Sequence, residues 1–368
     1  MKILAIETSC DETGLALLEV SGGLRAPRFN VLKSLVASQI KVHQPFGGVV
    51  PNLAKREHLK NLPVLYKKMF GAEGGAAEKK LWKQIDFITV TVGPGLEPAL
   101  WTGIEFAKKL SREKKKPLVG ANHLEGHLYS FLLPAAGEKK SARKSPFGNG
   151  SKNATVKNIF PSTALIVSGG HTIILNVDSF SKWKHLGETR DDAAGEAFDK
   201  VARLLDLPYP GGPEVERLAR VGDPHAINFP RPMLHDKNFD FSFSGLKTAV
   251  LYYLRDEKFE KLPKAKQDEL RKNVSASFQE AALDVLVKKT LKAARQTGAR
   301  SIILCGGVAA NKALRARLGK EAKKIGAAFL VPSFIYNLDN AAMIGAAGAM
   351  AYWRKKKYPI RANGSLGI

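Results

Sequence analysis

The fold is decided by Lys2-Ile-Leu-Ala-Ile-Glu-Thr-Ser-Cys-Asp-Glu-Thr-Gly-Leu-Ala-Leu-Leu-Glu-Val20, in which apolar residues lead into a polar turn and resume after it. This pattern predicts a β-hairpin with strands Ile3–Ile6 and Leu15–Val20 and an acidic, hydroxyl-rich tip. Residues 164–175 repeat the design around a glycine-rich tip, Ser168-Gly-Gly-His-Thr172. Two hairpins of the same construction therefore predict a repeated structural unit.

Each hairpin is followed by a second recurring element. Residues Phe87–Val92 read as a strand that runs into a Gly-Pro-Gly turn and then a helix over Pro98–Leu110. Residues Ser301–Leu304 run into a Gly-Gly turn and a helix beginning near Ala310. A strand, a glycine turn and a helix N-terminus commonly receive anions or nucleotides in α/β folds. Their recurrence in the same order predicts an internally duplicated α/β protein with a ligand in the cleft between its halves.

Length and charge limit the function classes. A chain of 368 residues exceeds the size at which one core stops growing, so two domains are expected. The formal charge of +24 favours a polyanionic partner, with nucleic acid first and a merely solubilising surface as the alternative. Because no aromatic residues interleave the basic clusters, we expect binding without sequence readout. These clusters are Lys108-Lys109, Arg112–Lys116, Lys139–Lys144 and Arg354–Lys357.

The cysteines and the first residues indicate the compartment. Cys10 and Cys305 have neither metal-binding nor redox spacing, which favours a reduced, cytoplasmic setting. The first residues do not form a signal peptide. No apolar run approaches the roughly 18 to 20 residues that span a bilayer, so no membrane partner is expected.

A metal site is indicated by His123-Leu-Glu-Gly-His127. Residues four apart lie on one helix face, so both imidazoles can reach one ion. Two histidines leave room for a third ligand and an open position, and Asp339 is the late candidate. The alternatives are two ordinary helix-face histidines and an aspartate that simply caps the following helix, although capping and metal binding are compatible.

The same stretch resembles the zinc-protease motif but lacks its base. In that motif the glutamate directly follows the first histidine. Here Glu125 lies one position later, which turns it roughly 200° away from His123 on a helix. A metal-dependent peptidase is therefore the disfavoured alternative.

The glycine-rich tip and a later glycine turn offer nucleotide-binding groups. The backbone N–H groups of Gly169 and Gly170 can converge on a phosphate, with Ser168, His171 and Thr172 as side-chain donors. An ordinary turn is the alternative. Two carboxylates, Asp199 and Glu216, flank the turn at residues 207–213 and can accept hydrogen bonds from ribose hydroxyls, although solvated helix carboxylates are the simpler interpretation.

Together, the motifs and their order resemble the tRNA threonylcarbamoyladenosine transferase family, often labelled O-sialoglycoprotein endopeptidase. They span nearly the whole chain. The matching stretches are Ile6-Glu-Thr-Ser-Cys-Asp-Glu-Thr13, Gly47-Gly-Val-Val-Pro51, Arg56-Glu-His58, Asn122-His-Leu-Glu-Gly-His127, Val167-Ser-Gly-Gly-His-Thr172, Asp191-Asp-Ala-Ala-Gly-Glu-Ala-Phe-Asp199, Tyr209-Pro-Gly-Gly-Pro213, Phe241-Ser-Phe-Ser-Gly-Leu-Lys247, Gly306-Gly-Val-Ala-Ala-Asn311 and Asp339-Asn-Ala-Ala-Met343.

The resemblance implies a duplicated actin-like ATPase (ASKHA) fold, in which two domains enclose an active-site cleft. This agrees with the repeat in the sequence. The expected N-terminal domain covers residues 1–121 and is completed by the C-terminal helix at 339–368. The expected C-terminal domain covers 122–338 and carries a basic loop at 134–160.

The resemblance also implies an activity and partners. The expected reaction moves a threonylcarbamoyl group from threonylcarbamoyl-AMP to the N6 amine of the adenosine next to the anticodon, in tRNAs reading codons that begin with A. The expected partners are tRNA, a related partner subunit and an ATPase subunit.

Site residues follow from the same resemblance. His123, His127 and Asp339 are expected to bind one divalent metal ion per chain, commonly iron, with zinc as the alternative. The acyl-phosphate part is expected at Val167, Ser168, Gly169, Gly170 and His171, and the adenosine part at Asp199, Gly212, Glu216 and Asn311. Asp11 and Glu12 match acidic residues near the acceptor amine, and either is a candidate general base.

The chain departs from the family pattern at three places, and none of them removes a ligand. Asn52 stands where the family usually has Glu, Tyr336-Asn337-Leu338 replaces a more Cys- and Thr-like approach, and the basic loop is longer than usual. Two other classes explain less. A sugar or carboxylate kinase shares the fold but gives the histidine pair no role, and a non-catalytic nucleic-acid-binding module leaves the metal and nucleotide motifs idle.

Overall fold

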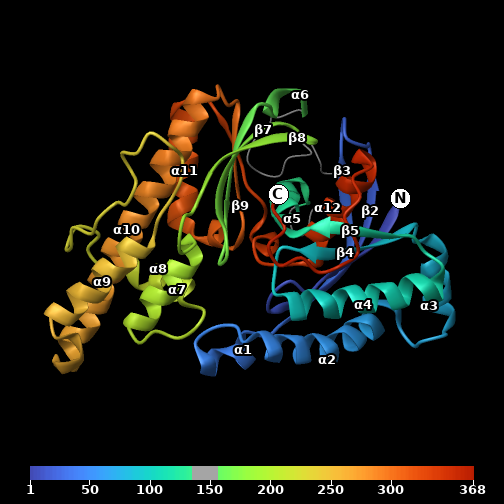
Figure 1. The fold of residues 1–368 in the computed structure, drawn as a ribbon, viewed down its shortest axis with the longest axis horizontal. Helices are drawn as coiled ribbons and strands as arrows, with labels where there is room; N and C mark the ends of the chain where they lie inside the picture. Colours follow the sequence, from blue (N-terminus) through green and yellow to red (C-terminus); the bar gives the residue numbers. More distant parts are fainter. Residues whose placement is uncertain (135–155) are drawn as a thin grey trace. The chain divides into compact units, whose positions relative to one another are not determined.

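The computed structural model describes residues 1–134 and 156–368, which form two compact units (Figure 1). Unit 1 contains Met1–Asn158 and Leu330–Ile368, and unit 2 contains Ile159–Phe329. This grouping places residues 122–134 and 156–158 with the N-terminal strands, whereas the expected second domain begins at residue 122. Most of the predicted basic loop at 134–160 lies outside the described residues.

Unit 1 is built on a five-stranded sheet with the order β3-β2-β1-β4-β5. The predicted N-terminal hairpin is confirmed, because β1 and β2 pair antiparallel with Ile6 opposite Leu15. β4 runs parallel to β1, and β5 runs parallel to β4. The strands are β1 (Lys2–Glu7), β2 (Glu12–Ser21), β3 (Arg28–Ser38), β4 (Phe87–Gly93) and β5 (Leu118–Asn122).

Helices cover the inner strands of this sheet. The helices of unit 1 are α1 (Ile40–His43), α2 (Pro51–Phe70), α3 (Ala76–Gln84), α4 (Glu97–Lys114), α5 (His123–Tyr129) and α12 (Ala341–Arg354). Leu4 and Leu15 share a core cluster with Leu62 of α2 and Ile104 of α4. Because β1 and β2 are buried along most of their lengths, they read as nearly continuous apolar runs.

The Ala- and Gly-rich stretch at 341–350 predicts a helix packed closely against its neighbours, and α12 confirms this prediction. A Cβ at Gly345 would lie 2.4 Å from Leu18 Cδ1, and one at Gly348 would lie 2.2 Å from Thr89 Oγ1. Glycine at these positions lets the helix backbone approach the sheet. Close packing here holds the segment after Asp339 against the N-terminal strands.

Unit 2 repeats the strand pattern of unit 1. Its sheet has the order β10-β9-β6-β7-β8, in which β6 and β7 form an antiparallel hairpin and β9 runs parallel to β6. β6, β7 and β9 therefore correspond to β1, β2 and β4, which confirms the predicted duplication. The strands are β6 (Ser162–Val167), β7 (Thr172–Ser179), β8 (Lys182–Glu188), β9 (Ser301–Cys305) and β10 (Ala328–Leu330).

The helices of unit 2 differ from expectation in one respect. They are α7 (Ala194–Leu204), α8 (Gly211–Ala219), α9 (Ser244–Asp256), α10 (Lys264–Gln296) and α11 (Lys312–Lys324). The charged pattern of residues 255–297 predicts several amphipathic helices, whereas most of this stretch is the single helix α10, whose middle turns are almost entirely buried. Short helical segments complete the chain: α6 (Val156–Ile159), η1 (Gln44–Phe46), η2 (Ser130–Leu132), η4 (Phe259–Lys261), η5 (Gly307–Ala310) and η6 (Phe334–Tyr336).

The helices of the described residues could not cross a membrane. Each of them is too short or too polar to span a bilayer.

Candidate metal centre and nucleotide site

α5 brings the two predicted histidine ligands onto one face. β5 ends at Asn122, whose side chain caps the helix by accepting a hydrogen bond of 3.1 Å from the Glu125 N–H. All residues of α5 are buried, and the ring centroids of His123 and His127 lie 4.7 Å apart. The predicted helical spacing is therefore present.

Asp339 lies at the same point, although it is distant in sequence. Its Oδ1 lies 3.5 Å from His123 Nε2 and 3.2 Å from His127 Nε2. One ligand atom from each of the three residues lies within 4.8 Å of the others. Two imidazoles and a carboxylate in this arrangement suit a divalent transition metal.

The surroundings of His127 fit a metal ligand. Its ring is buried, and neither ring nitrogen has a hydrogen bond of good geometry within the described part of the chain, despite the nearby Asp339 oxygen. Buried polar atoms are rarely left without a hydrogen bond unless an ion or a water molecule contacts them. The donor set and this incomplete imidazole together support a cation at the three residues.

The simpler role suggested for Asp339 is not observed. α12 is capped by Asn340, whose side chain accepts a hydrogen bond of 3.0 Å from the Met343 N–H. Asp339, one residue earlier, instead directs its carboxylate toward the histidines. Helix capping therefore does not explain Asp339.

The charges at this site favour a cation. Although burial by itself lowers the pKa of His123, Asp339 and Glu7 raise that pKa to about 9. Burial, partly offset by Asp339, lowers the pKa of His127. Without a metal, a proton on His123 balances the carboxylates, and a divalent cation would replace that proton.

Glu125 is turned away from the histidines, as the helical spacing predicts. It is fully buried, and its carboxylate accepts hydrogen bonds from Arg354, Lys356 and Tyr358. These contacts fix the opposite face of α5 to the end of α12 and to the segment that follows it. Glu125 therefore cannot serve as the base that the zinc-protease motif supplies, and the peptidase alternative is not supported.

Asp11 lies in the turn between β1 and β2, Glu12 is the first residue of β2, and both are almost completely buried. Helix α2 holds this turn through His58, whose Nε2 donates to the Cys10 carbonyl at 2.9 Å. Burial, together with the charges of Asp11 and Asp339, raises the pKa of Glu12 to about 10. The acidic turn is thus electrostatically close to the metal residues, and Glu12 keeps its proton at neutral pH when no cation is bound.

The predicted phosphate-binding turn lies between β6 and β7 in unit 2. The Ser168 N–H donates to the His171 carbonyl at 2.8 Å, and the His171 N–H donates to Ser168 Oγ at 3.1 Å. Cβ atoms added at Gly169 and Gly170 would have no atom of the described residues within 4 Å. Both glycines therefore border open space.

Two further elements lie against this turn. The first residues of α7 approach it, since the Gly195 N–H donates to the Ser168 carbonyl at 3.2 Å. Gly306, at the end of β9, has a φ of +96°, and a Cβ there would lie 2.3 Å from the Val167 carbonyl oxygen. Only glycine tolerates both constraints, so it allows the β9 turn to approach β6. A glycine turn beside a helix N-terminus is a typical anion-binding arrangement.

The four residues predicted for the adenosine part form one connected group. Asp199 Oδ1 accepts hydrogen bonds from the N–H groups of Gly211 at 2.8 Å and Gly212 at 3.2 Å. Glu216 accepts from the N–H of Lys312 at 3.0 Å, and Lys312 directly follows Asn311. The structure thus brings together α7, α8 and the start of α11.

These residues also have structural roles that the sequence interpretation missed. Asp199 satisfies the first N–H groups of α8, and Asn311 caps α11 by accepting from the Leu314 N–H at 2.9 Å. The available signal was an Asn directly before a helical pattern. In contrast, Gly212 is open: a Cβ there would approach only Phe198 Cβ, at 4.0 Å, among the described residues.

The sequence interpretation also missed Glu7. This buried carboxylate lies 3.4 Å from His123 Nδ1. The only available signal was a charged residue at the end of a strongly apolar strand, where burial is costly without a partner.

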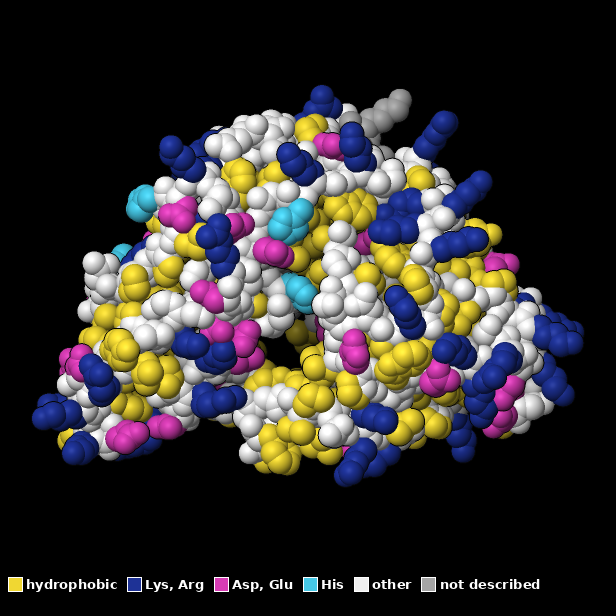
Figure 2. Space-filling model, viewed as in Figure 1, with side chains coloured by type: hydrophobic (Ala, Val, Ile, Leu, Met, Phe, Trp, Pro, Cys, Tyr) yellow, Lys and Arg dark blue, Asp and Glu magenta, His cyan; other side chains and the backbone are white. Residues whose placement is uncertain are grey.

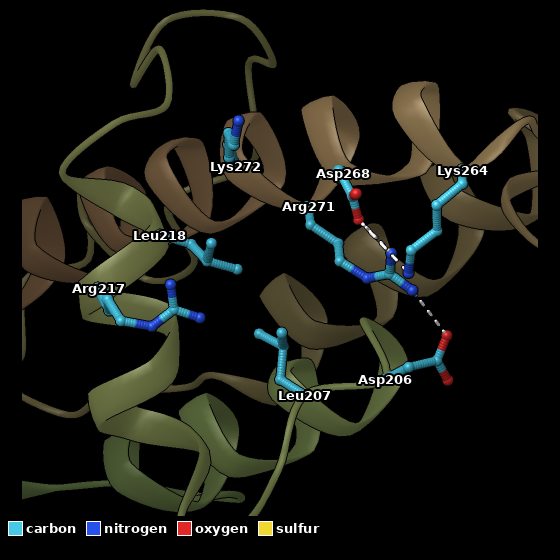
Figure 3. A pocket seen from close by; sticks show the side chains of 8 residues that line it. All are labelled: Asp206, Leu207, Arg217, Leu218, Lys264, Asp268, Arg271 and Lys272. Atoms are coloured by element: carbon cyan, nitrogen blue, oxygen red, sulfur yellow. Dashed lines mark hydrogen bonds and ion pairs between the residues drawn. The ribbon is translucent and has the colours of Figure 1, made fainter.

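A pocket of about 460 Å³ lies elsewhere in unit 2 (Figure 3). Its central Arg271 makes ion pairs with Asp206 at 3.2 Å and Asp268 at 3.0 Å. None of its lining residues is a predicted site residue. They are Asp206, Leu207, Arg217, Leu218, Lys264, Asp268, Arg271 and Lys272.

Comparison with known proteins gives consistent matches over the whole chain. The family model described as tRNA N6-adenosine threonylcarbamoyltransferase matches residues 30–145 and 150–346. A protein of that name from Thermosipho melanesiensis is 47% identical over 95% of this chain and 94% of its own length. The protein of the same name from Geobacter metallireducens is 45% identical over 95% of this chain and 91% of its own length. The one from Thermotoga neapolitana is 43% identical over 99% of this chain and 98% of its own length.

Solved structures agree on the fold. Full-length HypF in its phosphate- and nucleotide-bound form matches with a TM-score of 0.53 at 12% identity, over 98% of this chain and 47% of that one. HypF from T. kodakarensis matches with a TM-score of 0.52 at 13% identity, over 97% of this chain and 49% of that one. The predicted duplicated actin-like (ASKHA) α/β fold is confirmed.

Proposed function

This chain belongs to the tRNA N6-adenosine threonylcarbamoyltransferase family, and we propose that it transfers the threonylcarbamoyl group of threonylcarbamoyl-AMP to tRNA. The acceptor is the N6 amine of the adenosine next to the anticodon in tRNAs that read codons beginning with A. Within the structure, the convergence of His123, His127 and Asp339 carries this proposal. A cytoplasmic location accords with a tRNA substrate.

One divalent metal ion is held by His123, His127 and Asp339 in this proposal. Imidazole and carboxylate ligands suit iron, which we favour, and also zinc. When bound, the ion supplies Lewis acidity for a carbamoyl or phosphoryl oxygen.

The residues of unit 2 hold the adenylate. Val167, Ser168, Gly169, Gly170 and His171 bind the acyl-phosphate part, where open backbone N–H groups beside the start of α7 stabilise negative charge. Asp199, Gly212, Glu216 and Asn311 bind the adenosine part. Their connection through α8 and α11 supports a single nucleotide site.

The chemical step needs orientation more than activation, because an acyl adenylate is already activated. The adenosine amine attacks the carbamoyl carbon, the bond from that carbon to the phosphate oxygen breaks, and AMP leaves with the electron pair. Asp11 or Glu12 accepts the amine proton. Since Glu12 retains its own proton without a cation, it serves as the acceptor only when bound positive charge lowers its pKa.

The division of labour between proteins can be tested by reconstitution. The sequence contains no separate motif for activating threonine with bicarbonate and ATP, so another enzyme must make the adenylate. The purified chain, given tRNA, ATP, threonine and bicarbonate, should leave the tRNA unmodified. Addition of the adenylate synthase, the related partner subunit and the ATPase subunit should produce threonylcarbamoyladenosine, measured by mass spectrometry of digested nucleosides. Modified nucleoside from the chain alone would refute this arrangement.

Binding of tRNA should depend steeply on salt. Lys and Arg side chains are spread over much of the face shown in Figure 2, and the formal charge is +24. Each phosphate neutralised by the protein releases counterions, so about four such contacts would lower affinity roughly 100-fold between 50 and 200 mM salt. Titration calorimetry should show this loss for tRNA and little change for AMP. Salt-independent tRNA affinity would contradict a basic docking surface.

A further inference from the structure

Glu7, the last residue of β1, is a buried carboxylate beside the metal ligands. It is fully inaccessible to solvent and accepts hydrogen bonds from Thr91 Oγ1 at 2.7 Å and from the Ser9 N–H. Its Oε2 also lies 3.4 Å from His123 Nδ1. Burying a carboxylate is costly unless polar partners surround it, so its position requires an explanation.

The topology explains how these groups meet. β1 and β4 are parallel neighbours, with Ile6 opposite Val90, so Glu7 and Thr91 both lie at the carboxyl ends of their strands. β5 is parallel to β4, and His123 directly follows it. Because carboxyl ends of parallel strands meet at one edge, residues distant in sequence converge there.

The orientation of His123 gives Glu7 its task. Its Nε2 faces Asp339 at 3.5 Å, whereas its Nδ1 faces Glu7 and, at 3.1 Å, Ser9 Oγ. An imidazole that binds a metal through Nε2 carries its proton on Nδ1. A carboxylate that accepts a hydrogen bond from this Nδ1–H fixes both the tautomer and the orientation of the ring, as in carboxylate–histidine–metal arrangements.

We propose that Glu7 is the positioning residue of the metal centre: its carboxylate accepts a hydrogen bond from the Nδ1–H of His123 and so presents Nε2 to the metal. The inference rests on the proposed metal site. The proposal also gives the two histidines different surroundings, because His127 Nδ1 has no hydrogen-bond partner within residues 1–134 and 156–368. His123 is thus oriented before a cation arrives, and Glu7 is the reason.

The test is the metal affinity of Glu7→Gln, which preserves shape and removes the negative charge. Competition between the protein and a chromophoric chelator for Fe²⁺, without oxygen, should show an affinity about 10- to 100-fold lower than that of the unmodified chain. With Co²⁺ as the probe, the visible ligand-field spectrum should also shift, which a general loss of stability would not cause.

Glu78→Gln is the matched control. Glu78 is also a buried glutamate of unit 1, and it accepts hydrogen bonds from Lys114 at 2.6 Å and from Tyr66. Although burial by itself raises its pKa, the bonds from Lys114 and Tyr66 hold that pKa at about 2. Its replacement should lower the thermal unfolding temperature while Fe²⁺ affinity and the Co²⁺ spectrum stay unchanged.

The possible outcomes distinguish failure of the proposed metal site from failure of the proposed role of Glu7. A wild-type chain that binds neither Fe²⁺ nor Co²⁺ would remove the metal site itself. If the wild type binds metal and folded Glu7→Gln binds it equally well with an identical spectrum, only the role of Glu7 is overturned. Should Glu7→Gln not fold, Glu7→Asp keeps the charge on a shorter side chain, and full affinity in that variant would count against the proposal.

Ser9 must be separated from Glu7, because its hydroxyl lies near the same nitrogen. Ser9→Ala should reduce metal affinity much less than Glu7→Gln, since a hydroxyl is a weaker acceptor than a carboxylate. A larger loss in Ser9→Ala than in Glu7→Gln would assign the positioning role to Ser9 and overturn the inference.

Discussion

Replacing His127 with alanine should abolish stoichiometric metal binding and tRNA modification together. The substitution removes one of the three proposed protein ligands, and a site reduced to His123 and Asp339 should bind iron at least about 100-fold more weakly. His127 has no hydrogen bond of good geometry to any described residue that would give it another task. Elemental analysis of the purified variant and mass spectrometry of the reconstituted tRNA measure the two losses.

A surface histidine provides the control. His185 in β8 has a side chain 45% exposed and lies outside the predicted sites, so His185→Ala should retain both metal and activity. Unchanged metal stoichiometry in a folded His127→Ala variant would show that the three residues do not form the metal centre.

Gly212→Leu should weaken adenylate binding by at least about tenfold without destabilising the protein. Gly212 lies in the first turn of α8, where a Cβ would approach only Phe198 among the described residues. The new side chain can therefore extend into the space proposed for adenosine. Leucine is a better helix former than glycine by about 0.5–1 kcal/mol, so the unfolding temperature should not fall. Calorimetric titration with AMP and thermal unfolding measure the two effects.

The neighbouring glycine shows why this position is informative. A Cβ at Gly211 would lie 2.3 Å from Ala202 Cβ and 2.9 Å from Asp199 Cα, so Gly211→Ala should destabilise unit 2. Asn311→Ala is less useful, because it also removes the cap of α11, which costs about 1 kcal/mol. Normal AMP affinity in Gly212→Leu would exclude Gly212 from the nucleotide site.

Local sequence patterns predicted much of the fold. Apolar runs on either side of Thr8–Gly14 and Ser168–Thr172 predicted the two hairpins, and the strand-Gly-helix recurrence predicted the duplication. Spacing also predicted that His123 and His127 share a face and that Glu125 does not. These features depend on residues close together in sequence, where periodicity fixes direction.

Long-range partners could not be predicted in the same way. Nothing near Glu7 in the sequence indicates Thr91 or His123, because their meeting depends on the order of strands in the sheet. The length of α10 was not predicted either. Its first turns are rich in charged residues, which indicate an exposed helix, whereas its middle turns are buried. The capping roles of Asp199 and Asn311 were not predicted from the sequence, although each satisfies N–H groups at the start of a helix. Ligand binding and helix capping both use side-chain oxygen atoms of Asp and Asn. The residue type alone therefore does not distinguish a ligand-binding residue from a helix cap.

The division of unit 1 into two segments has a consequence for biogenesis. Residues 159–329 lie between them, so a ribosome translates all of unit 2 before it reaches Asp339 and α12. A nascent chain therefore exposes the sheet surface that α12 will cover, and it lacks Asp339, the last of the three proposed metal ligands, until translation is nearly finished. In the proposed site, the complete ligand set therefore exists only in a nearly full-length chain, and a product terminated before Asp339 would lack one of the three ligands.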